Sequence, residues 1–391
     1  MNHRNSISEL TPARRRVSGF VLSLGFSLSA SATVMLGVLL PVLSQRWTLT
    51  DETAGLLMFL QFLGSALGAV CTGLNRVRSL LYGYALLVLS MGAIALSTSP
   101  APFAAFFFYG LGLGMVMTAT SLLVTDRSGD ESAAKLEGLN FIWSVGATVG
   151  PMLFVPFLHT LDVRALFSAL LCLFLLLLTW VAFAEHQEPR RAQMNESRAV
   201  GLGARGALLP LVILAMCAVG VEAALSGWLT TYSHRAGLRN LAGAALATSL
   251  FWLGEMLSRF AFSTRLLAKI GRRATLHATI CGVLVSLVAL VAVPSPSAIL
   301  VVAAIAGICI GPLYPLLLSF MLEHSARGWI FAVGGLGAAV FPWLTGSLSA
   351  HFHSLRFGLM APCGAGLIMV LLQTIAARRT IVTEPAASAH S

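Results

Sequence analysis

The sequence contains few charged residues, and that scarcity excludes most classes of soluble protein. Only 10% of the 391 residues are Asp, Glu, Lys or Arg, whereas 57% are hydrophobic. A soluble domain carries roughly 25% charged residues. The hydrophobic residues form runs of about 20, the length of a helix that crosses a bilayer, and not the alternating ten-residue strands of an outer-membrane barrel. The composition therefore predicts an all-α integral membrane protein.

The sequence also lacks the motifs of metal sites, disulfides and common enzymes, which excludes several classes of function. The six cysteines lie inside hydrophobic runs and lack the spacing of metal ligands or disulfides, so we expect small core residues. The metalloprotease pattern His-Glu-x-x-His, the Gly-x-Ser-x-Gly elbow and the phosphate-binding loop do not occur. We therefore expect no enzymatic activity, no metal and no cofactor. The net charge of +10 falls in short loops between the runs, which argues against a nucleic-acid partner.

Twelve hydrophobic runs predict twelve transmembrane helices in two pseudo-symmetric six-helix bundles. A polar stretch, 186–206, follows the sixth run and predicts a flexible linker. We expect a tail at 1–16, a first bundle at 17–185, a second bundle at 207–376 and a tail at 377–391. The runs lie at 17–43, 53–74, 79–98, 102–125, 138–160, 164–185, 207–230, 243–264, 274–293, 297–322, 328–350 and 355–376.

The positions of lysine and arginine predict the orientation. An even number of spans places both termini on one side of the membrane, and most of the 25 Lys and Arg residues fall on that side. Basic loops are retained in the cytoplasm, so we expect both termini to be cytoplasmic, in the cell (inner or plasma) membrane. The opposite side carries only Arg46, Arg164, Arg235, Arg239 and Arg356.

The two halves share glycine patterns in the same order. Gly110 and Gly114 in the fourth run correspond to Gly307 and Gly311 in the tenth. Glycines four residues apart allow helices to pack closely, although glycine is also frequent in membrane helices for other reasons. Duplicated six-helix halves are typical of transporters, in which the solute site lies at the midplane between the halves.

The spans, the central linker and two basic turns resemble the major facilitator superfamily. The turns are Gly73-Leu-Asn-Arg76-Val-Arg78 and Ala268-Lys-Ile-Gly271-Arg272-Arg273. The resemblance implies a fold of two six-helix bundles. It also implies that Arg76, Arg78, Gly271, Arg272 and Arg273 belong to gating loops on the cytoplasmic side.

A closer resemblance lies in the fifth, seventh and eighth runs. Residues 139–151, 220–232 and 249–259 contain Asn140, Trp143, Glu222, Trp228 and Trp252 with their flanking glycines. Together these segments look like the fucose–galactose–glucose:proton symporter branch and its sugar-permease relatives. The resemblance implies uptake of a monosaccharide together with protons.

Glu222 is the most informative residue in the hydrophobic runs. It lies in an apolar stretch, 211–232, where a carboxylate costs roughly 2.5–3.5 kcal/mol. Trp252, Glu255 and Arg259 form one stripe on the next run, at i, i+3 and i+7. Glu255 and Arg259 can form a structural pair within their helix. Glu222 has no partner on its own helix, so we expect it to face Arg259, a solute or a proton.

A sugar site needs aromatic faces for the ring and polar side chains for the hydroxyl groups. Asn140 and Trp143 are three residues apart and share a helix face, and Trp143 and Trp252 lie deeper in their runs than the tryptophans at span ends. For each candidate a structural role is the alternative: membrane anchoring for Trp228 and Tyr232, helix bridging for the amides, and packing for the others. The expected substrate-binding residues are Gln61, Asn140, Trp143, Trp228, Tyr232 and Trp252, and the expected proton-coupling residues are Glu222, Glu255 and Arg259.

The remaining acids point to structural roles. Asp51 and Glu52 precede the second run and are expected to cap it. The acids near the turn between the fourth and fifth runs are expected to form gating salt bridges or a solvated face. They are Asp126, Asp130, Glu131 and Glu137.

These patterns predict a monomeric secondary transporter that takes up a small polar solute, a hexose or deoxyhexose, with protons by alternating access. Sodium coupling and uniport stay open. Efflux of drugs or metabolites is one alternative, and it would require a larger apolar cavity. A lipid flippase is another, because Arg259 can bind a headgroup phosphate. A membrane sensor is the least favoured, because no loop is long enough for an output domain.

Overall fold

Every regular element in the described part of the chain is a helix. The expected N-terminal tail and residues 186–204 of the expected linker lie outside that part. The computed structural model describes residues 17–73, 75–98, 100–128, 132–154, 163–185, 205–238, 240–262, 270–293, 295–324 and 329–382.

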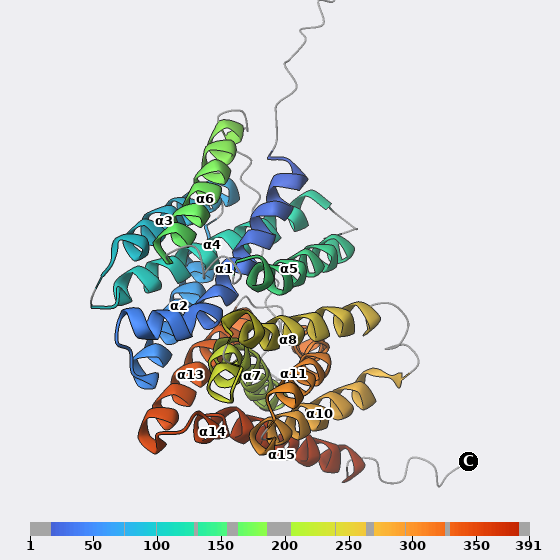
Figure 1. Cartoon of the computed structure of the whole chain (residues 1–391). Helices are drawn as coiled ribbons and strands as arrows, with labels where there is room; N and C mark the ends of the chain where they lie inside the picture. The colour runs from blue at the N-terminus through green and yellow to red at the C-terminus, as the bar shows by residue number, and fades with distance from the viewer. Residues whose placement is uncertain are drawn as a thin grey trace, which may run out of the picture.

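The chain forms two groups of helices, which Figure 1 shows one above the other. The first group, in blue to green, consists of α1 (Gly19–Arg46), α2 (Asp51–Cys71), α3 (Arg76–Leu96), α4 (Phe103–Ser128), α5 (Ser132–Phe154) and α6 (Val163–Glu185). The second, in yellow-green to red, consists of α7 (Arg205–Arg235), α8 (Leu241–Ala261), α10 (Arg272–Ala292), α11 (Pro296–Ile310), α12 (Leu313–His324), α13 (Trp329–Phe352), α14 (Leu355–Gly358) and α15 (Met360–Val382).

Two of the twelve expected spans are each built from two helices. The tenth span comprises α11 and α12, which are separated at Gly311 and Pro312 because proline cannot donate the next backbone hydrogen bond. The twelfth comprises the short α14 and the long α15, which continues past residue 376. Ten spans, including the α11–α12 unit, are long and apolar enough to cross a membrane, and α5 and α13 complete the set. The all-α fold of twelve membrane helices is confirmed.

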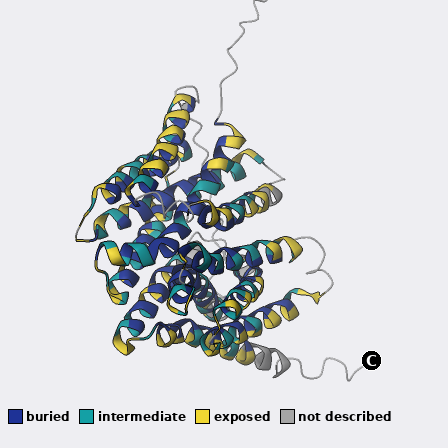
Figure 2. Ribbon diagram, viewed as in Figure 1, coloured by how far each residue is buried: buried dark blue, intermediate teal, exposed yellow. Residues whose placement is uncertain are grey.

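The outward faces of the helices are apolar. Large hydrophobic side chains such as Leu89, Leu96 and Phe183 are more than 70% exposed. Figure 2 shows exposed residues along the outer faces and buried ones between the helices. In a bilayer such side chains contact lipid, and a helix satisfies most of its backbone polar groups internally.

The prediction that the cysteines are core residues is wrong for half of them. Cys217 is buried, whereas Cys71, Cys172 and Cys281 are exposed. A small, weakly polar side chain is as compatible with lipid as with a protein core, so hydrophobic surroundings in the sequence do not separate the two environments.

The helix contacts of the first half are repeated in the second. In the first half, α1 packs against α5, α2 against α4, and α3 against both α4 and α6. In the second half, α7 packs against α13, α8 against α11, and α10 against both α11 and α15. The contacts between the halves follow the same pseudo-symmetry. The pair α2–α13 corresponds to the pair α5–α8, and α1 packs on its counterpart α7.

The expected glycine pattern produces the closest of these contacts. A Cβ atom on Gly110 or Gly114 of α4 would overlap the backbone carbonyl of Gln61 or Ser65 on α2. In the second half, a Cβ atom on Gly307 of α11 would overlap the carbonyl of Phe251 on α8. Glycine is therefore required for these helices to lie backbone against backbone.

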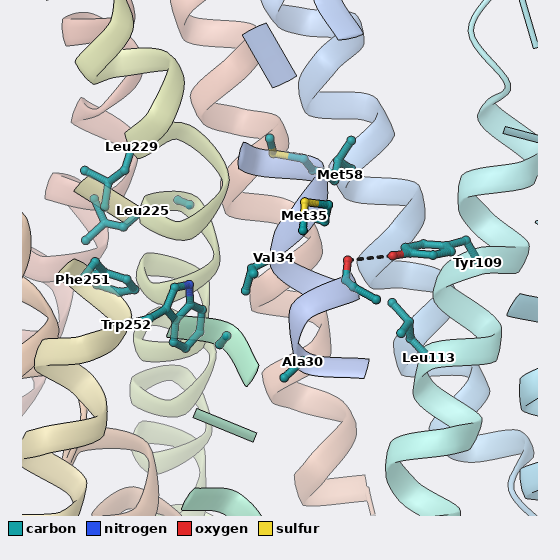
Figure 3. Packing of buried hydrophobic residues seen from close by; sticks show 14 of the residues in the cluster. Ala30, Val34, Met35, Met58, Tyr109, Leu113, Leu225, Leu229, Phe251 and Trp252 are labelled. Atoms are coloured by element: carbon teal, nitrogen blue, oxygen red, sulfur yellow. Dashed lines mark hydrogen bonds between the residues drawn. The ribbon is translucent and has the colours of Figure 1, made fainter. Parts of the chain in front are cut away.

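The two ends of the bundle are named after one residue at each. The Asp51 end holds the end of α1, the start of α2, the end of α7 and the start of α8, and the Arg76 end holds the end of α2, the start of α3, the end of α8 and the start of α10. Between the ends, α1 and α7 pack side by side at the centre. Figure 3 shows this region, where Trp252 and Phe251 of α8 and Leu225 of α7 lie near Val34 of α1.

Candidate functional site

Three charged side chains meet where the second half faces the first. A side-chain oxygen of Glu255 forms an ion pair with Arg259, one helical turn away on α8. The Oε2 atom of Glu222, on α7, lies 3.8 Å from Nη2 of the same arginine. Arg259, on the neighbouring helix, is one of the three partners expected for Glu222 from the sequence, the others being a solute and a proton. The charge-coupling role predicted for the three residues stays a prediction.

The burial of the three residues differs. Glu255 is completely buried, while the side chains of Arg259 and Glu222 are 22% and 16% exposed. Apart from the contact with Arg259, neither side-chain oxygen of Glu255 has a hydrogen-bonding partner among the described residues. A buried carboxylate of this kind depends on its one counter-ion. Glu222 is therefore the carboxylate of the pair with greater access to solvent or a solute.

Arg259 also contacts the first half of the molecule. Its Nη1 atom donates a 3.4 Å hydrogen bond to Oγ of Ser144 on α5, and its Nε atom donates a 3.2 Å bond to the carbonyl of Gly311. That carbonyl lacks the usual helical donor because residue 315 is a proline. The Pro312–Pro315 break thus leaves a backbone acceptor that holds the guanidinium group in place.

Two tryptophans from different halves, Trp143 and Trp252, are in contact. Trp252 lies on the face of α8 that also carries Glu255. The rings of Trp143 on α5 and Trp252 on α8 are 5.0 Å apart between centroids and inclined at 70°. The Nε1 atom of Trp252 donates a 3.2 Å hydrogen bond to Oγ of Ser226 on α7, whereas Nε1 of Trp143 is buried and has no partner among the described residues. The pair combines an apolar surface with an unused hydrogen-bond donor.

The predicted amide residues have different environments. Asn140 is exposed and lies one turn from Trp143 on α5, toward the Arg76 end. Gln61 is buried, and its Nε2 atom donates a 2.9 Å hydrogen bond to the carbonyl of Thr33 on α1. Within the described part of the chain, its Oε1 atom has no hydrogen-bonding partner. Gln61 therefore bridges two helices and retains one free acceptor.

Trp228 and Tyr232 are used for packing in this structure. The Nε1 atom of Trp228 donates a 2.9 Å hydrogen bond to the carbonyl of Pro342 on α13. The hydroxyl group of Tyr232 donates a 2.8 Å bond to the carbonyl of Leu290 on α10. Both side chains are at most 3% exposed, so neither lies as an anchor at a lipid–water interface and neither has a free donor for a solute.

The residues of the predicted gating loops lie at the Arg76 end. Arg76 forms a 3.8 Å ion pair with Asp126 of α4, which agrees with one of the two roles expected for that acid. Arg272 donates a 2.7 Å hydrogen bond to Oγ of Ser319 on α12 and lies over the ring of Phe320. Gly271 has a positive φ of 82°, as expected for glycine before a helix. The other two loop residues, Arg78 and Arg273, are exposed.

An ion pair between the halves at the Asp51 end was missed by the sequence prediction. Asp51 accepts two hydrogen bonds from Arg235 of α7, at 2.7 and 2.6 Å, and one from Oγ of Ser349 on α13, at 2.6 Å. Thr50, and not Asp51, is the N-cap residue of α2. The available signal was that Asp51 lies on the side with few basic residues, one of which is Arg235.

Comparisons with known proteins agree on one fold. A family model described as Major Facilitator Superfamily matches residues 22–342. A POT family transporter in complex with a thioalcohol-conjugated peptide is 14% identical with a TM-score of 0.73, over 94% of this chain and 96% of that chain. A mutant of the nucleoside transporter NupG is 14% identical with a TM-score of 0.69, over 93% and 98%. A bacterial homolog of the human lysosomal transporter Spinster, in an inward-facing and occupied conformation, is 16% identical with a TM-score of 0.62, over 95% and 98%.

At these identities the solved structures show a shared fold and no shared substrate. No curated protein matches the sequence significantly. The family model, in contrast, covers most of the 391 residues and includes Glu222, Glu255, Arg259 and the Trp143–Trp252 pair. The chain therefore belongs to the major facilitator superfamily and is a membrane transporter, not an enzyme.

Proposed function

We propose that this protein takes up a monosaccharide together with protons, by alternating access of its two halves. The observation that carries the proposal is the meeting of Glu222, Glu255 and Arg259 beside the Trp143–Trp252 pair, at the contact between α5 and α8. Tryptophan faces pack against the apolar face of a sugar ring, and carboxylate and amide groups bind its hydroxyls. The resemblance to the fucose–galactose–glucose:proton symporter branch supports the same substrate class.

Each residue has a distinct role in this proposal. Trp143 and Trp252 pack against the sugar ring, and Asn140, which is exposed toward the Arg76 end, binds hydroxyl groups on that side of the ring. Glu222 accepts the coupled proton, because it is the more accessible carboxylate. Protonation removes the charge of Glu222. Arg259 then keeps its ion pair with Glu255 and its hydrogen bond to Ser144 of the other half. A change in protonation thereby alters a contact between the halves, as coupling requires.

The proposed orientation places the Arg76 end in the cytoplasm and the Asp51 end outside the inner or plasma membrane. Most lysines and arginines favour this arrangement. The Asp51–Arg235 ion pair then joins the halves on the outer side. We accordingly propose that the structure represents a state closed toward the outside, with monomers as the functional unit and bundles at 17–185 and 207–376.

A zwitterionic solute, such as a short peptide, is a second candidate. It is favoured by the presence of one guanidinium group and two carboxylates in one site, which can pair with opposite charges on a solute. One of the similar solved structures is a POT family transporter in complex with a peptide conjugate. A sugar remains the first candidate because the aromatic pair lies beside the charged group.

Uptake into proteoliposomes tests the proposal. We expect accumulation of a labelled hexose or deoxyhexose when an inward proton gradient is imposed, and only equilibration without the gradient. Replacing sodium by potassium should leave accumulation unchanged. Competition by a dipeptide in place of a hexose would select the second candidate. Uptake that ignores the gradient would disprove proton coupling.

The variant Glu222→Gln separates coupling from binding. The amide keeps the shape of the side chain but cannot carry the proton in and out. We expect concentrative uptake to be lost while exchange of labelled for unlabelled sugar continues. Glu52→Gln, an exposed carboxylate in the first turn of α2, is the matched control and should behave like the unmodified protein. Unchanged accumulation in Glu222→Gln would exclude Glu222 as the coupling group.

A further inference from the structure

A row of buried hydroxyl groups extends from Glu222 toward the Asp51 end. On α7, Ser226, Thr230 and Ser233 follow Glu222 at spacings of four, four and three residues, so all four side chains share one face. The three hydroxyl residues are at most 6% exposed. On α8, Thr248 joins the row through its contact with Thr230, and its neighbour Ser249 is buried as well; both are at most 1% exposed.

The hydrogen bonds of this row differ from those of most buried hydroxyls in the described helices. Thr148, Thr279 and Thr345 each donate to the carbonyl four residues earlier on their own helix, which uses their only hydrogen. In contrast, Thr230 and Thr248 bond to each other across the two helices, with 2.8 Å between their Oγ1 atoms. One of these two hydrogens is therefore free for a further acceptor.

The other members of the row have spare bonding capacity as well. Ser226 accepts the hydrogen bond from Nε1 of Trp252, which leaves its own hydrogen and one lone pair unused. Ser233 and Ser249 are buried and have no partner among the described residues. A buried hydroxyl without a partner costs about 1–3 kcal/mol, a cost that an ordered water molecule removes.

The spacing of the α7 hydroxyls suits one bridging water per turn. Successive residues of the row are one helical turn apart, or about 5.4 Å along the axis. Two O–H···O hydrogen bonds of about 2.8 Å that meet at one water span about 4.5 Å or slightly more, which side chains that lean toward each other can match. A single water molecule can thus bond to both neighbours, and the hydroxyls and waters form a continuous chain.

We propose that this row, hydrated by one water per turn, is the path on which protons move between the Asp51 end and Glu222. The inference rests on the proposed proton coupling. Each oxygen in the chain accepts a proton on one side and releases one on the other, so that one proton reaches the carboxylate and nothing is oxidised or reduced. Glu222 changes from negative to neutral.

The charged and titratable groups around Glu222 lie outside the row. Among the described residues, Arg259 and Glu255 of α8 and Tyr314 of α12 interact electrostatically with it. Every member of the row itself is a neutral hydroxyl residue on α7 or α8. Replacing the row therefore changes the access of protons to Glu222 and leaves its charged neighbours in place.

The test measures protonation of Glu222 without any transported solute. In proteoliposomes, a pH jump on the side of the Asp51 end is followed by infrared spectroscopy of the protonated carboxyl band, assigned as the band that Glu222→Gln lacks. In the double variant Thr230→Val, Thr248→Val, we expect the band to appear at least tenfold more slowly. Because both partners of one bond become apolar groups of similar shape, the fold should tolerate the change.

Matched variants separate a proton path from a general effect. Thr279→Val removes a buried hydroxyl on α10 that bonds only within its own helix, and its rate should equal that of the unmodified protein. Thr230→Ser with Thr248→Ser keeps both hydroxyls and should restore the rate. A Glu222-dependent band with unchanged kinetics in the valine double variant, or equal slowing in Thr279→Val, overturns the path alone. Absence of any Glu222-dependent band overturns the proposed coupling and the path with it.

Discussion

At the scale of single residues, Arg259 holds the proposed site together. It contacts Glu222 of α7, Glu255 of its own helix, Ser144 of α5 and the carbonyl of Gly311. A guanidinium group can make these contacts at once because its five donors point in fixed directions. Lysine carries the same charge at a single point, so charge and geometry can be tested separately.

We predict that Arg259→Lys folds normally but transports poorly. The ammonium group can still neutralise Glu255, whereas the bonds to Ser144 and Gly311 are lost. One charge-assisted hydrogen bond contributes about 1.5–3 kcal/mol, so the initial uptake rate should fall about tenfold or more. The measurement is labelled uptake in proteoliposomes, together with thermal unfolding of the purified variant.

Two further variants test the charge of Arg259 and control for the effect of an arginine-to-lysine substitution. Arg259→Ala leaves the completely buried Glu255 without its counter-ion, so we expect loss of about 3–5 kcal/mol of stability and a lower unfolding temperature. Arg356→Lys, on an exposed arginine at the Asp51 end, should leave both properties unchanged. An Arg259→Lys protein with full activity would show that the geometry of the guanidinium group is unimportant.

At the scale of helices, glycine determines which pairs lie backbone against backbone. The α8–α11 pair approaches at Gly254, Gly307 and Gly311, as the α2–α4 pair does at its own glycines. Gly311 lies against the backbone of Glu255, so this packing also positions the buried carboxylate of the site. Helix packing and site geometry are thus linked on α8.

We predict that Gly307→Ala destabilises the protein, because its Cβ atom would overlap the carbonyl of Phe251 on α8. Overpacking of this kind costs about 1–3 kcal/mol and should lower the unfolding temperature. The control is Gly364→Ala on α15, where a Cβ atom would meet no atom within 4 Å. There the higher helix propensity of alanine should leave stability equal or slightly raised. Equal unfolding temperatures for both variants would contradict the packing argument.

The sequence predicted helices better than it predicted the partners of their side chains. The spacing of Trp252, Glu255 and Arg259 was sufficient to place them on one face, because helix periodicity is a local property. Trp228 and Tyr232 have the same i, i+4 spacing, yet each bonds to a backbone carbonyl of another helix. A sequence pattern gives the face of a helix but not the neighbour that covers it.

At the scale of the whole molecule, the two halves are joined at the Asp51 end by a network of hydrogen bonds. Asp51 of the first half bonds to Arg235 and Ser349 of the second. Near it, Gly346 of α13 lies against the backbone of Asp51 itself. Opening at this end therefore requires that one carboxylate gives up all three hydrogen bonds.

We predict that Asp51→Asn shifts the population toward a state open at the Asp51 end. The asparagine keeps the shape but loses the charge that pairs with Arg235. Because this arginine is 46% exposed, the loss is about 1 kcal/mol, or a several-fold change in population. Spin labels at Thr98 and Ser295, exposed residues of opposite halves, would report a longer distance in a cysteine-free protein.

The charge-reversed pair is the control for this prediction. Asp51→Arg combined with Arg235→Asp restores opposite charges between α2 and α7 and should recover the short distance between labels. Glu52→Gln removes a neighbouring exposed carboxylate and should change nothing. A distance that is the same in Asp51→Asn and the unmodified protein would show that other contacts hold this end closed.

The sequence by itself determined the membrane class, the helices, the internal repeat and the presence of costly charges such as Glu222. These properties follow from composition and from the period of the α-helix, which are both local. Only the tertiary structure decided that Glu222 lies 3.8 Å from Arg259, that Gln61 bridges to α1, and that Asp51 joins the halves. Such contacts depend on how helices distant in sequence pack in space, and the lipid-facing and inward-facing sides of these helices are almost equally apolar.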